Sequence, residues 1–505
     1  MGMTVIFAAN KGGHQGAIGL AEEAIEQLRQ PLMLPNPIDF ANPNAILNAV
    51  EYFQLEYGDR WVGSQALRAG VVLHHGDLPQ ETREVAESLV RNGHVKFAIC
   101  TNTLAEGVNL PIRTLVLYSV QRHGKSGRPE SLLTRDIKNL VGRAGRAGAT
   151  TKGLVICVNE QQWPLVEQVA LQASGERVVG ALRSLLVELR AAVEVRNFHL
   201  TNANLEHNPR LHTLVDGIDY TLIDLAAEEV GEEELTRIAV TLADETFASQ
   251  QADATSKLLL QQVFELRARR IIGLRTTGRL NWIRETGARA RIIESVESGL
   301  APSRNDWSSV TDSLDSNLVT SLLEWAWAQR ELQLTAREAY RIGDNADVNT
   351  AKRPFFEMVG RWLSGASFVD IAIHLNVSID ELLAIHTRVV TFGLQSLLEQ
   401  GIALLAKVIE SGDPELLLAP AVIKFPEHLR FGVPTQAGCT LAAGGVRHRR
   451  AAVELGSIAD IRDLSIENRA LVFSVAREHL VRDRTDWQAR LGRLVFEHTI
   501  QDLES

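Results

Sequence analysis

Short apolar runs alternate with helical segments through the first 160 residues, and this alternation constrains the fold more than any other feature. The runs that favour strands lie at 4–8, 71–73, 95–100, 114–119 and 154–158. Helical periodicity lies between them, at 15–28, 45–57, 60–69, 79–91 and 135–147. Such alternation is typical of a parallel sheet with helices on both faces. We therefore predict an α/β lobe at the N-terminal end of this sequence.

The pattern changes after about residue 159. Strand alternation disappears, and Leu, Ala, Glu and Arg recur at helical spacing, most clearly over 178–195, 232–249 and 252–274. We expect a mostly α-helical C-terminal region in which 438–445 forms a loop. At roughly 150 residues per domain, 505 residues predict about three domains. We place their boundaries at 1–160, 161–300 and 301–505, with an Arg-rich helix in the second.

Composition excludes several classes of protein. A net charge of −10 argues against a basic wrapper of nucleic acid, and 45% hydrophobic with 23% charged residues excludes disorder for most of the chain. No stretch approaches the ~18 uninterrupted apolar residues of a membrane span, and the start lacks the pattern of a secretory signal. Three sparse cysteines exclude a disulfide framework and a Cys-rich zinc site. We expect a cytoplasmic protein with no metal site of its own and no membrane partner.

One candidate site follows the predicted strand at 95–100. Residues 101–111 read TNTLAEGVNLP, and Thr103 and Glu106 have the spacing of a capping box. Ligands of open α/β sheets bind just outside the carboxyl ends of strands, and the free N–H groups of a helix start attract phosphate. An ordinary strand-to-helix turn has the same local pattern.

A second candidate is the segment 136–146, DIKNLVGRAGR. Two glycines inside a predicted helix cost about 1 kcal/mol each relative to alanine, which implies a close backbone approach. Arg143 and Arg146 are three residues apart and therefore share a helix face. Paired guanidinium groups suit bidentate phosphate contacts. The alternative is a solvated arginine face.

Together and in this order, these segments resemble the second RecA-like lobe of superfamily 2 nucleic-acid helicases, in particular the superkiller-like branch of the DExH-box enzymes. The later helical part is similar only in general character to that family's winged-helix and ratchet domains. Four segments carry the resemblance: 4–9 (motif IV), 73–79 with Arg83 (the branch's paired-histidine segment), 101–111 (motif V) and 139–146 (motif VI, with Asn139 in place of Gln).

The resemblance implies a role for each matching residue. Arg143 and Arg146 would be arginine fingers on the γ-phosphate of ATP. His74 and His75 would end a strand and pack or contact the backbone rather than bind a metal. The implied ATP-binding residues are Gly107, Asn109, Asn139 and Gly142, and the implied nucleic-acid-binding residues are Thr101, Thr103 and Arg83.

The nucleotide site would be incomplete in this sequence. No G-x-x-x-x-G-K-[ST] phosphate loop occurs in it. The segment 9–16, ANKGGHQG, is similar to the deviant phosphate loop of ParA-type ATPases, but Ala17 and Ile18 stand where Lys and Ser/Thr are required. We therefore interpret 11–16 as the turn after the first strand. ATP and Mg²⁺ would both need a first RecA-like lobe, from a longer chain or a partner subunit, and this chain alone would be inactive.

The Arg-rich stretch at 267–291 is a candidate nucleic-acid surface. Eight arginines crowd it, and Trp282 lies among them. Basic groups interleaved with an aromatic ring suit backbone tracking and base stacking on a single strand. Arg269 and Arg270 are therefore candidate contacts to single-stranded DNA or RNA. The alternative is a helical face that forms salt bridges with the acidic segment 219–245.

Two further segments have weaker signals. Residues 355–389 resemble a helix-turn-helix, but Asp380 and Glu381 would carry negative charge into a DNA groove, which favours a packing role. The basic segment 446–450 could contact phosphate or be solvated. As a whole, the sequence predicts the C-terminal part of an ATP-dependent nucleic-acid helicase or translocase. The alternative is a non-hydrolysing nucleic-acid-binding or interaction subunit that works with a partner chain.

Overall fold

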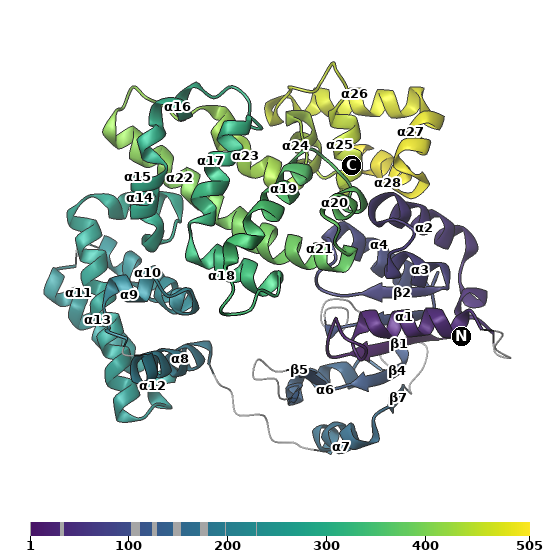
Figure 1. Cartoon of the computed structure of the whole chain (residues 1–505), viewed down its shortest axis with the longest axis horizontal. Helices are drawn as coiled ribbons and strands as arrows, with labels where there is room; N and C mark the ends of the chain where they lie inside the picture. Colours follow the sequence, from purple (N-terminus) through teal and green to yellow (C-terminus); the bar gives the residue numbers. More distant parts are fainter. Residues whose placement is uncertain are drawn as a thin grey trace. The chain divides into compact units, whose positions relative to one another are not determined.

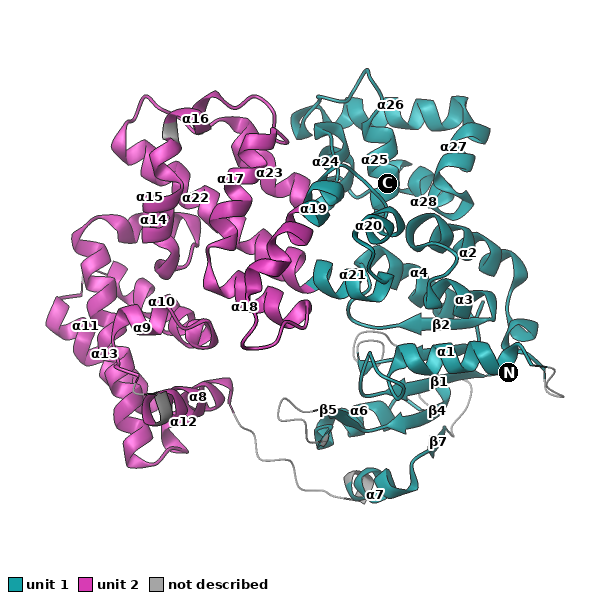
Figure 2. Ribbon diagram, in the orientation of Figure 1, with its two compact units in different colours: residues 1–176, 357–387, 431–505 teal, residues 177–356, 388–430 magenta. Residues whose placement is uncertain are grey.

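The computed structural model forms two compact units (Figures 1 and 2). Unit 1 comprises 1–176, 357–387 and 431–505, and unit 2 comprises 177–356 and 388–430. Unit 1 is discontinuous, so late helices pack with the N-terminal lobe, and the three-part division predicted from composition stays a prediction. The structure describes residues 2–30, 35–102, 112–123, 129–144, 153–171, 180–196, 198–228 and 230–504.

A five-stranded parallel sheet organises the first part of unit 1, as predicted. Its strand order is β2-β3-β1-β4-β7. The central strand β1 reads MTVIFA and buries Val5 and Phe7, because a parallel strand covered on both faces must be apolar. The strands are β1 (Met3–Ala8), β2 (Val71–His74), β3 (Phe97–Cys100), β4 (Ile112–Ser119) and β7 (Leu154–Cys157).

Helices connect and cover these strands and complete a RecA-like lobe (Figure 1). The Asn42 side chain caps α2 by accepting hydrogen bonds from the backbone N–H groups of Asn44 and Ala45. Pro43 occupies the first helical position, where its missing N–H costs no hydrogen bond because that position has no partner within the helix. Helices α1, α3 and α4 contact β2. The helices are α1 (Ala17–Leu28), α2 (Pro43–Tyr57), α3 (Val62–Arg68), α4 (Gln80–Arg91), α6 (Thr134–Val141) and α7 (Trp163–Leu171).

Helix α6 is shorter than predicted. It ends at Val141, and Gly142 is its C-terminal cap, whose N–H donates to the Lys138 carbonyl. The prediction that Gly142 lies inside a helix is therefore wrong. A glycine at a helix end carries no helix-interior penalty, so this position does not by itself require a close backbone approach. The structure also forms a short antiparallel pair, β5 (Gln121–His123) with β6 (Pro129–Ser131), whose strands are too short to show periodicity.

The prediction of a loop at 438–445 is wrong, because α24 (Gln436–Ala443) occupies most of it. The Thr435 hydroxyl caps this helix by accepting the Gly438 N–H at 3.1 Å. A Cβ at Gly438 would lie 3.0 Å from the Ala452 carbonyl of α25 (Arg449–Gly456). The glycine therefore allows two helices to pack closely, and it does not form a turn. The other late helices of unit 1 are α20 (Phe368–Leu375), α21 (Ile379–Ile385), α26 (Arg469–Arg482), α27 (Arg484–Leu491) and α28 (Arg493–Glu504).

Unit 2 confirms the predicted mostly α-helical region. Its core contains fully buried side chains from several helices, among them Leu189, Val215 and Val263. Among the described residues, one helical run, Ile379–Gly412, which begins in unit 1, is long and apolar enough to cross a membrane, and half of its most apolar window is buried inside the structure. The principal helices are α8 (Ala181–Arg196), α10 (His212–Ala227), α11 (Glu232–Glu245), α13 (Ala254–Thr276), α14 (Arg279–Thr286), α15 (Ile293–Gly299), α17 (Ser316–Trp327), α18 (Arg330–Ala339) and α22 (Gln395–Gly412).

Candidate nucleotide and nucleic-acid site

The carboxyl ends of neighbouring strands bring polar residues to one edge of the sheet. The β2–β3 register pairs His74 with Cys100, and the β1–β3 register pairs Phe7 with Cys100, so the three strands end at one level. The Thr101 N–H then donates to the His74 carbonyl at 3.2 Å. Thr101 is half-buried at this edge, which is where ligands of open α/β sheets bind.

The turn after β1 is closed on itself. The amide of Ala17 donates to the Asn10 carbonyl at 2.9 Å, and the amide of Ile18 donates to the Lys11 carbonyl at 3.0 Å. The first N–H groups of α1 are thus used inside the turn, whereas a phosphate cradle needs them free. Lys11 forms an ion pair with Asp77, Nζ to Oδ2, at 2.6 Å. These contacts agree with the interpretation of 11–16 as a turn.

The two histidines after β2 are buried. His74 Nε2 lies 3.1 Å from Glu87 Oε1, and His75 Nε2 lies 3.7 Å from Asp380 Oδ1. Burial, with a smaller effect of Lys11, lowers the pKa of His75 to about 3, so this ring is neutral at pH 7. Both rings pack, as expected. In the part of the chain that the structure describes, no group of three or more His, Cys, Asp or Glu side chains is arranged to hold a metal ion.

The motif VI segment lies at the end of α6. Asn139 is exposed on this helix, while Gly142 and Arg143 are half-buried. Arg143 lines a small apolar cavity whose other lining residues are Val5, Phe7, Cys100, Ile112, Leu115 and Leu140. The role of Arg143 stays a prediction. Four other predicted site residues lie outside the described residues: Thr103, Gly107, Asn109 and Arg146.

The Arg-rich stretch forms salt bridges within unit 2. Arg269 is 65% exposed but pairs with Glu265 of the same helix at 2.5 Å, and half-buried Arg270 pairs with Glu206 and Glu294. Most of the acidic partners lie outside 219–245, at Glu206, Asp216, Glu294, Glu297 and Glu331. Seven of the eight arginines donate to carboxylates or carbonyls: Arg267, Arg269, Arg270, Arg275, Arg279, Arg289 and Arg291. This pairing favours the salt-bridge alternative over an open basic surface.

Arg83 and the helix-turn-helix segment, the other candidate nucleic-acid contacts, also form hydrogen bonds within unit 1. Arg83 on α4 donates from Nη2 to Gln80 Oε1 at 2.7 Å. In the helix-turn-helix segment, the Lys11 ammonium donates to the Asp380 carbonyl at 3.1 Å, so the acidic helix α21 packs on the lobe, as its charge favoured. The roles in nucleic-acid binding of Arg83, Thr101, Arg269 and Arg270 stay predictions.

The basic segment 446–450 takes part in a buried polar cluster of unit 1. Arg447 forms an ion pair with Asp502, and Arg450 donates to the Arg490 carbonyl. Arg449 is buried, stacks on the Trp362 ring at 3.9 Å and donates its backbone N–H to Glu81 Oε2 at 2.7 Å. These arginines therefore join helices of unit 1 to one another.

Glu81 makes the stability of unit 1 depend on pH. Burial, followed by the nearby Glu56, raises the pKa of Glu81 to about 7, above its ordinary value of 4.5. The stabilising contribution of a group with a raised pKa is fully present below its unfolded value and is lost as pH rises through its folded value. Gln stays neutral at every pH, whereas Glu81 of the wild type ionises as the pH rises. We therefore expect the unfolding free energy of Glu81→Gln minus that of wild type to increase by about 2–3 kcal/mol from pH 5 to pH 8.

Urea unfolding of both proteins across this pH range measures the effect. The matched control is Glu84→Gln, an exposed position on the same helix, which should differ from wild type by the same amount at every pH. A pH-independent difference between Glu81→Gln and wild type would contradict the assignment.

Comparison with known proteins agrees with this geometry. The family profile of the helicase conserved C-terminal domain matches residues 41–148. The chain is 32% identical over 120 residues to the Hachiman protein HamB of Bacillus cereus, which covers 23% of this chain and 10% of HamB. It is 40% identical over 95 residues to the ATP-dependent DNA helicase Hel308 of Aeropyrum pernix, covering 19% of this chain and 13% of Hel308.

A third relative is the antiviral helicase SKI2 of Saccharomyces cerevisiae, 38% identical over 90 residues, which covers 18% of this chain and 7% of SKI2. The matched part therefore spans only about a tenth of the length of these three relatives. The profile match at 41–148 includes β2, β3, β4 and α6 of the lobe described above. Residues 41–148 thus match the helicase conserved C-terminal domain, and these similarities support a region like the C-terminal region of superfamily 2 DExH-type helicases.

Proposed function

We propose that this chain works as the C-terminal part of an ATP-dependent nucleic-acid helicase or translocase of the superkiller-like branch. It would supply the arginine fingers and half of the groove for a single strand of DNA or RNA. The observation that supports the proposal most is the half-buried Arg143, which follows α6 in a segment that matches the helicase conserved C-terminal domain.

In this proposal, the residues of the lobe stabilise charge at the γ-phosphate. A guanidinium placed beside the transferring phosphoryl group stabilises the charge that spreads over its oxygens. Arg143 would be the first arginine finger and Arg146 the second. Four residues would lie beside the nucleotide: Gly107, Asn109, Asn139 and Gly142. The exposure of Asn139 and the partial exposure of Arg143 leave both accessible to a ligand.

The other half of the nucleotide site would come from a first RecA-like lobe. The sequence has no G-x-x-x-x-G-K-[ST] loop, and the turn at 11–16 uses its own amides. No metal-binding cluster occurs among the described residues, so Mg²⁺ would be held by that first lobe together with the β- and γ-phosphates. The lobe could belong to a longer chain or to a partner subunit.

The nucleic-acid path would begin at the carboxyl edge of the sheet. Thr101 and Thr103 would contact a strand phosphate, and Arg83 would extend this face. In unit 2, Arg269 is the better of the two candidates, because its salt bridge is exposed and therefore weak, whereas Arg270 is held by two carboxylates. The second candidate function is a non-hydrolysing binding subunit, which the missing phosphate loop favours.

An ATPase assay separates the two functions. We expect the chain alone, with ATP, Mg²⁺ and single-stranded DNA or RNA, to hydrolyse no ATP above background. Joined to a first lobe from the same genome that carries a G-K-[ST] loop and a D-E-x-H box, it should show hydrolysis stimulated by nucleic acid. The first lobe alone is the control. Stimulated hydrolysis by this chain alone would contradict its incompleteness, and no hydrolysis by the assembly would favour the binding subunit.

A further inference from the structure

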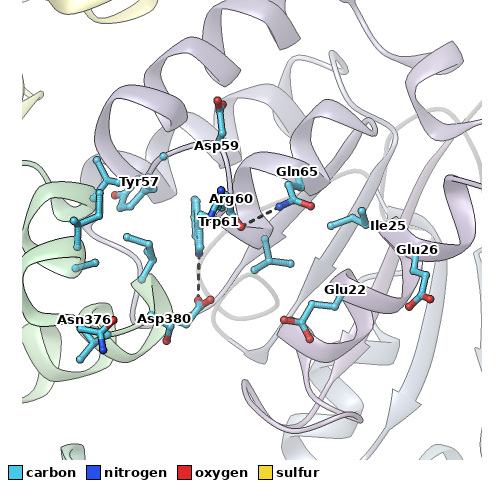
Figure 3. Close-up of a pocket in the computed structure, with 18 of the residues that line it drawn as sticks. Glu22, Ile25, Glu26, Tyr57, Asp59, Arg60, Trp61, Gln65, Asn376 and Asp380 are labelled. Carbon is cyan, nitrogen blue, oxygen red and sulfur yellow. Dashed lines mark hydrogen bonds between the residues drawn. The ribbon is translucent and has the colours of Figure 1, made fainter.

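Unit 1 contains a large groove that shares no lining residue with the small cavity beside Arg143 (Figure 3). Its volume is about 910 Å³, and it is lined by α1, by the segment 57–65 and by 369–380 of α20 and α21. This size is sufficient for several side chains of a peptide. Figure 3 shows Glu22 and Glu26 on one side of the groove and Asp380 with Trp61 on the other.

Asp380 is a partly buried carboxylate, and the nearby Lys11 ammonium lowers its pKa without forming a direct ion pair with it. Its side chain is 20% exposed, and its Oδ1 accepts the Trp61 Nε1–H at 3.4 Å. The ammonium of Lys11 donates to the backbone carbonyl of Asp380 and pairs with the carboxylate of Asp77 instead. His75, at 3.7 Å, is neutral at pH 7. Within the described ranges, no Lys or Arg side chain forms an ion pair with the Asp380 carboxylate.

The rest of the groove adds negative charge. Glu22 and Glu26 are exposed on α1, and neither forms an ion pair with any other described residue. Burial raises the pKa of Asp380, the Lys11 ammonium and the Trp61 hydrogen bond lower it, and Glu22 raises it by a smaller effect, so the Asp380 and Glu22 carboxylates repel each other weakly. Four acidic residues line the groove against two basic ones, Glu22, Glu26, Asp59 and Asp380 against Arg29 and Arg60, but Asp59 already forms an ion pair with Arg68.

An apolar strip runs beside these acids. Ile373 on α20 is 74% exposed, which is unusual for a large aliphatic side chain on a packed helix. Val369, Ala372 and Ile25 line the same groove. A ligand that covers this strip would therefore need an apolar side chain next to a cation.

We propose that this groove docks a basic, amphipathic segment of a partner protein. An Arg or Lys of the segment would pair with Asp380 and Glu22, and an aliphatic side chain one helical turn away would cover Ile373. Charge complementarity excludes the phosphate backbone of nucleic acid as the occupant, because these carboxylates repel it. The argument for this groove does not use the ATP chemistry proposed above.

Binding of a designed probe tests the proposal on the full chain. The probe is a 14-residue fluorescein-labelled helical peptide with Arg and Leu four residues apart on one face, and the matched peptide has Gln in place of Arg. We expect anisotropy to show binding of the Arg peptide, weakened about tenfold by Glu22→Gln, Asp380→Asn or Ile373→Ser. Glu23→Gln, exposed on α1 outside the groove, should leave the affinity unchanged.

Three outcomes would overturn the proposal. The first is equal binding of the Arg and Gln peptides, or none by either. The second is unchanged affinity in Glu22→Gln, an exposed position whose substitution should leave the fold intact even if Asp380→Asn unfolds. The third is another occupant: displacement of the peptide by single-stranded DNA, or self-association in sedimentation that Ile373→Glu abolishes, which would assign the groove to nucleic acid or to a second copy of this chain.

Discussion

Replacing Arg143 by alanine should reduce the nucleic-acid-stimulated ATP hydrolysis of the assembled two-lobe enzyme by about 10³-fold or more. Arginine fingers stabilise the charge of the transferring phosphoryl group and are worth about 10³–10⁵ in rate. Arg143 follows the end of α6 and is half-buried, so its side chain is partly accessible to a ligand. Arg143→Lys should fail to restore the rate, because a point charge does not reproduce the planar fork.

Steady-state kcat and the affinity for a labelled single strand should be measured together. The expected result is a large loss of kcat with little change in strand affinity, since the finger acts on the nucleotide. Arg135→Ala is the matched control: it lies on the same helix, is 74% exposed and pairs only with the adjacent Asp136, and its activity should equal wild type. Arg143 also has contacts within the lobe, so a thermal melt must accompany the assay. An Arg143→Ala enzyme within a few-fold of wild type would remove the finger from the mechanism.

Arg267→Ala should lower the free energy of unfolding of unit 2 by about 3–5 kcal/mol. The Arg267 side chain is fully buried in α13, and its guanidinium donates from Nε and Nη2 to the two oxygens of Asp219, at 2.7 and 2.6 Å. Its Nη1 contacts Glu206 Oε1 at 2.6 Å. Without the arginine, the buried Asp219 carboxylate would lose its bidentate partner, and leaving such a charge uncompensated is the main cost.

Urea unfolding that monitors unit 2 measures this loss, and Arg269→Ala is the control. Arg269 lies two residues away on the same helix, but its exposed pair with Glu265 should be worth less than about 1 kcal/mol. The double variant Arg267→Met with Asp219→Leu should recover part of the stability, because it removes both charges. A loss below 1 kcal/mol for Arg267→Ala would show that the ion pair does not stabilise the unit.

The sequence predicted the elements that depend on local periodicity. The apolar runs became strands of a parallel sheet, and the segments between them became helices, because burial on both faces of a strand or along one face of a helix imposes a repeat that is visible over a few residues. The predictions were wrong at glycines, because the same residue type is found in loops, at helix ends and where two helices pack closely. Gly438 was interpreted as a loop residue, but it permits the close packing of α24 and α25. Gly142 was placed inside a helix, but it ends one.

By itself, then, the amino-acid order determined the α/β lobe, its helical continuation and the motifs whose resemblance to DExH-type helicases the family comparison supports. Only the tertiary structure decided which charges are available. Arg267 is neutralised by Asp219 and Glu206, whereas Glu22 and Glu26 form no ion pair with another described residue. The reason is physical: apolar periodicity is a local property of the chain, but the pairing of charges depends on contacts between residues tens to hundreds of positions apart.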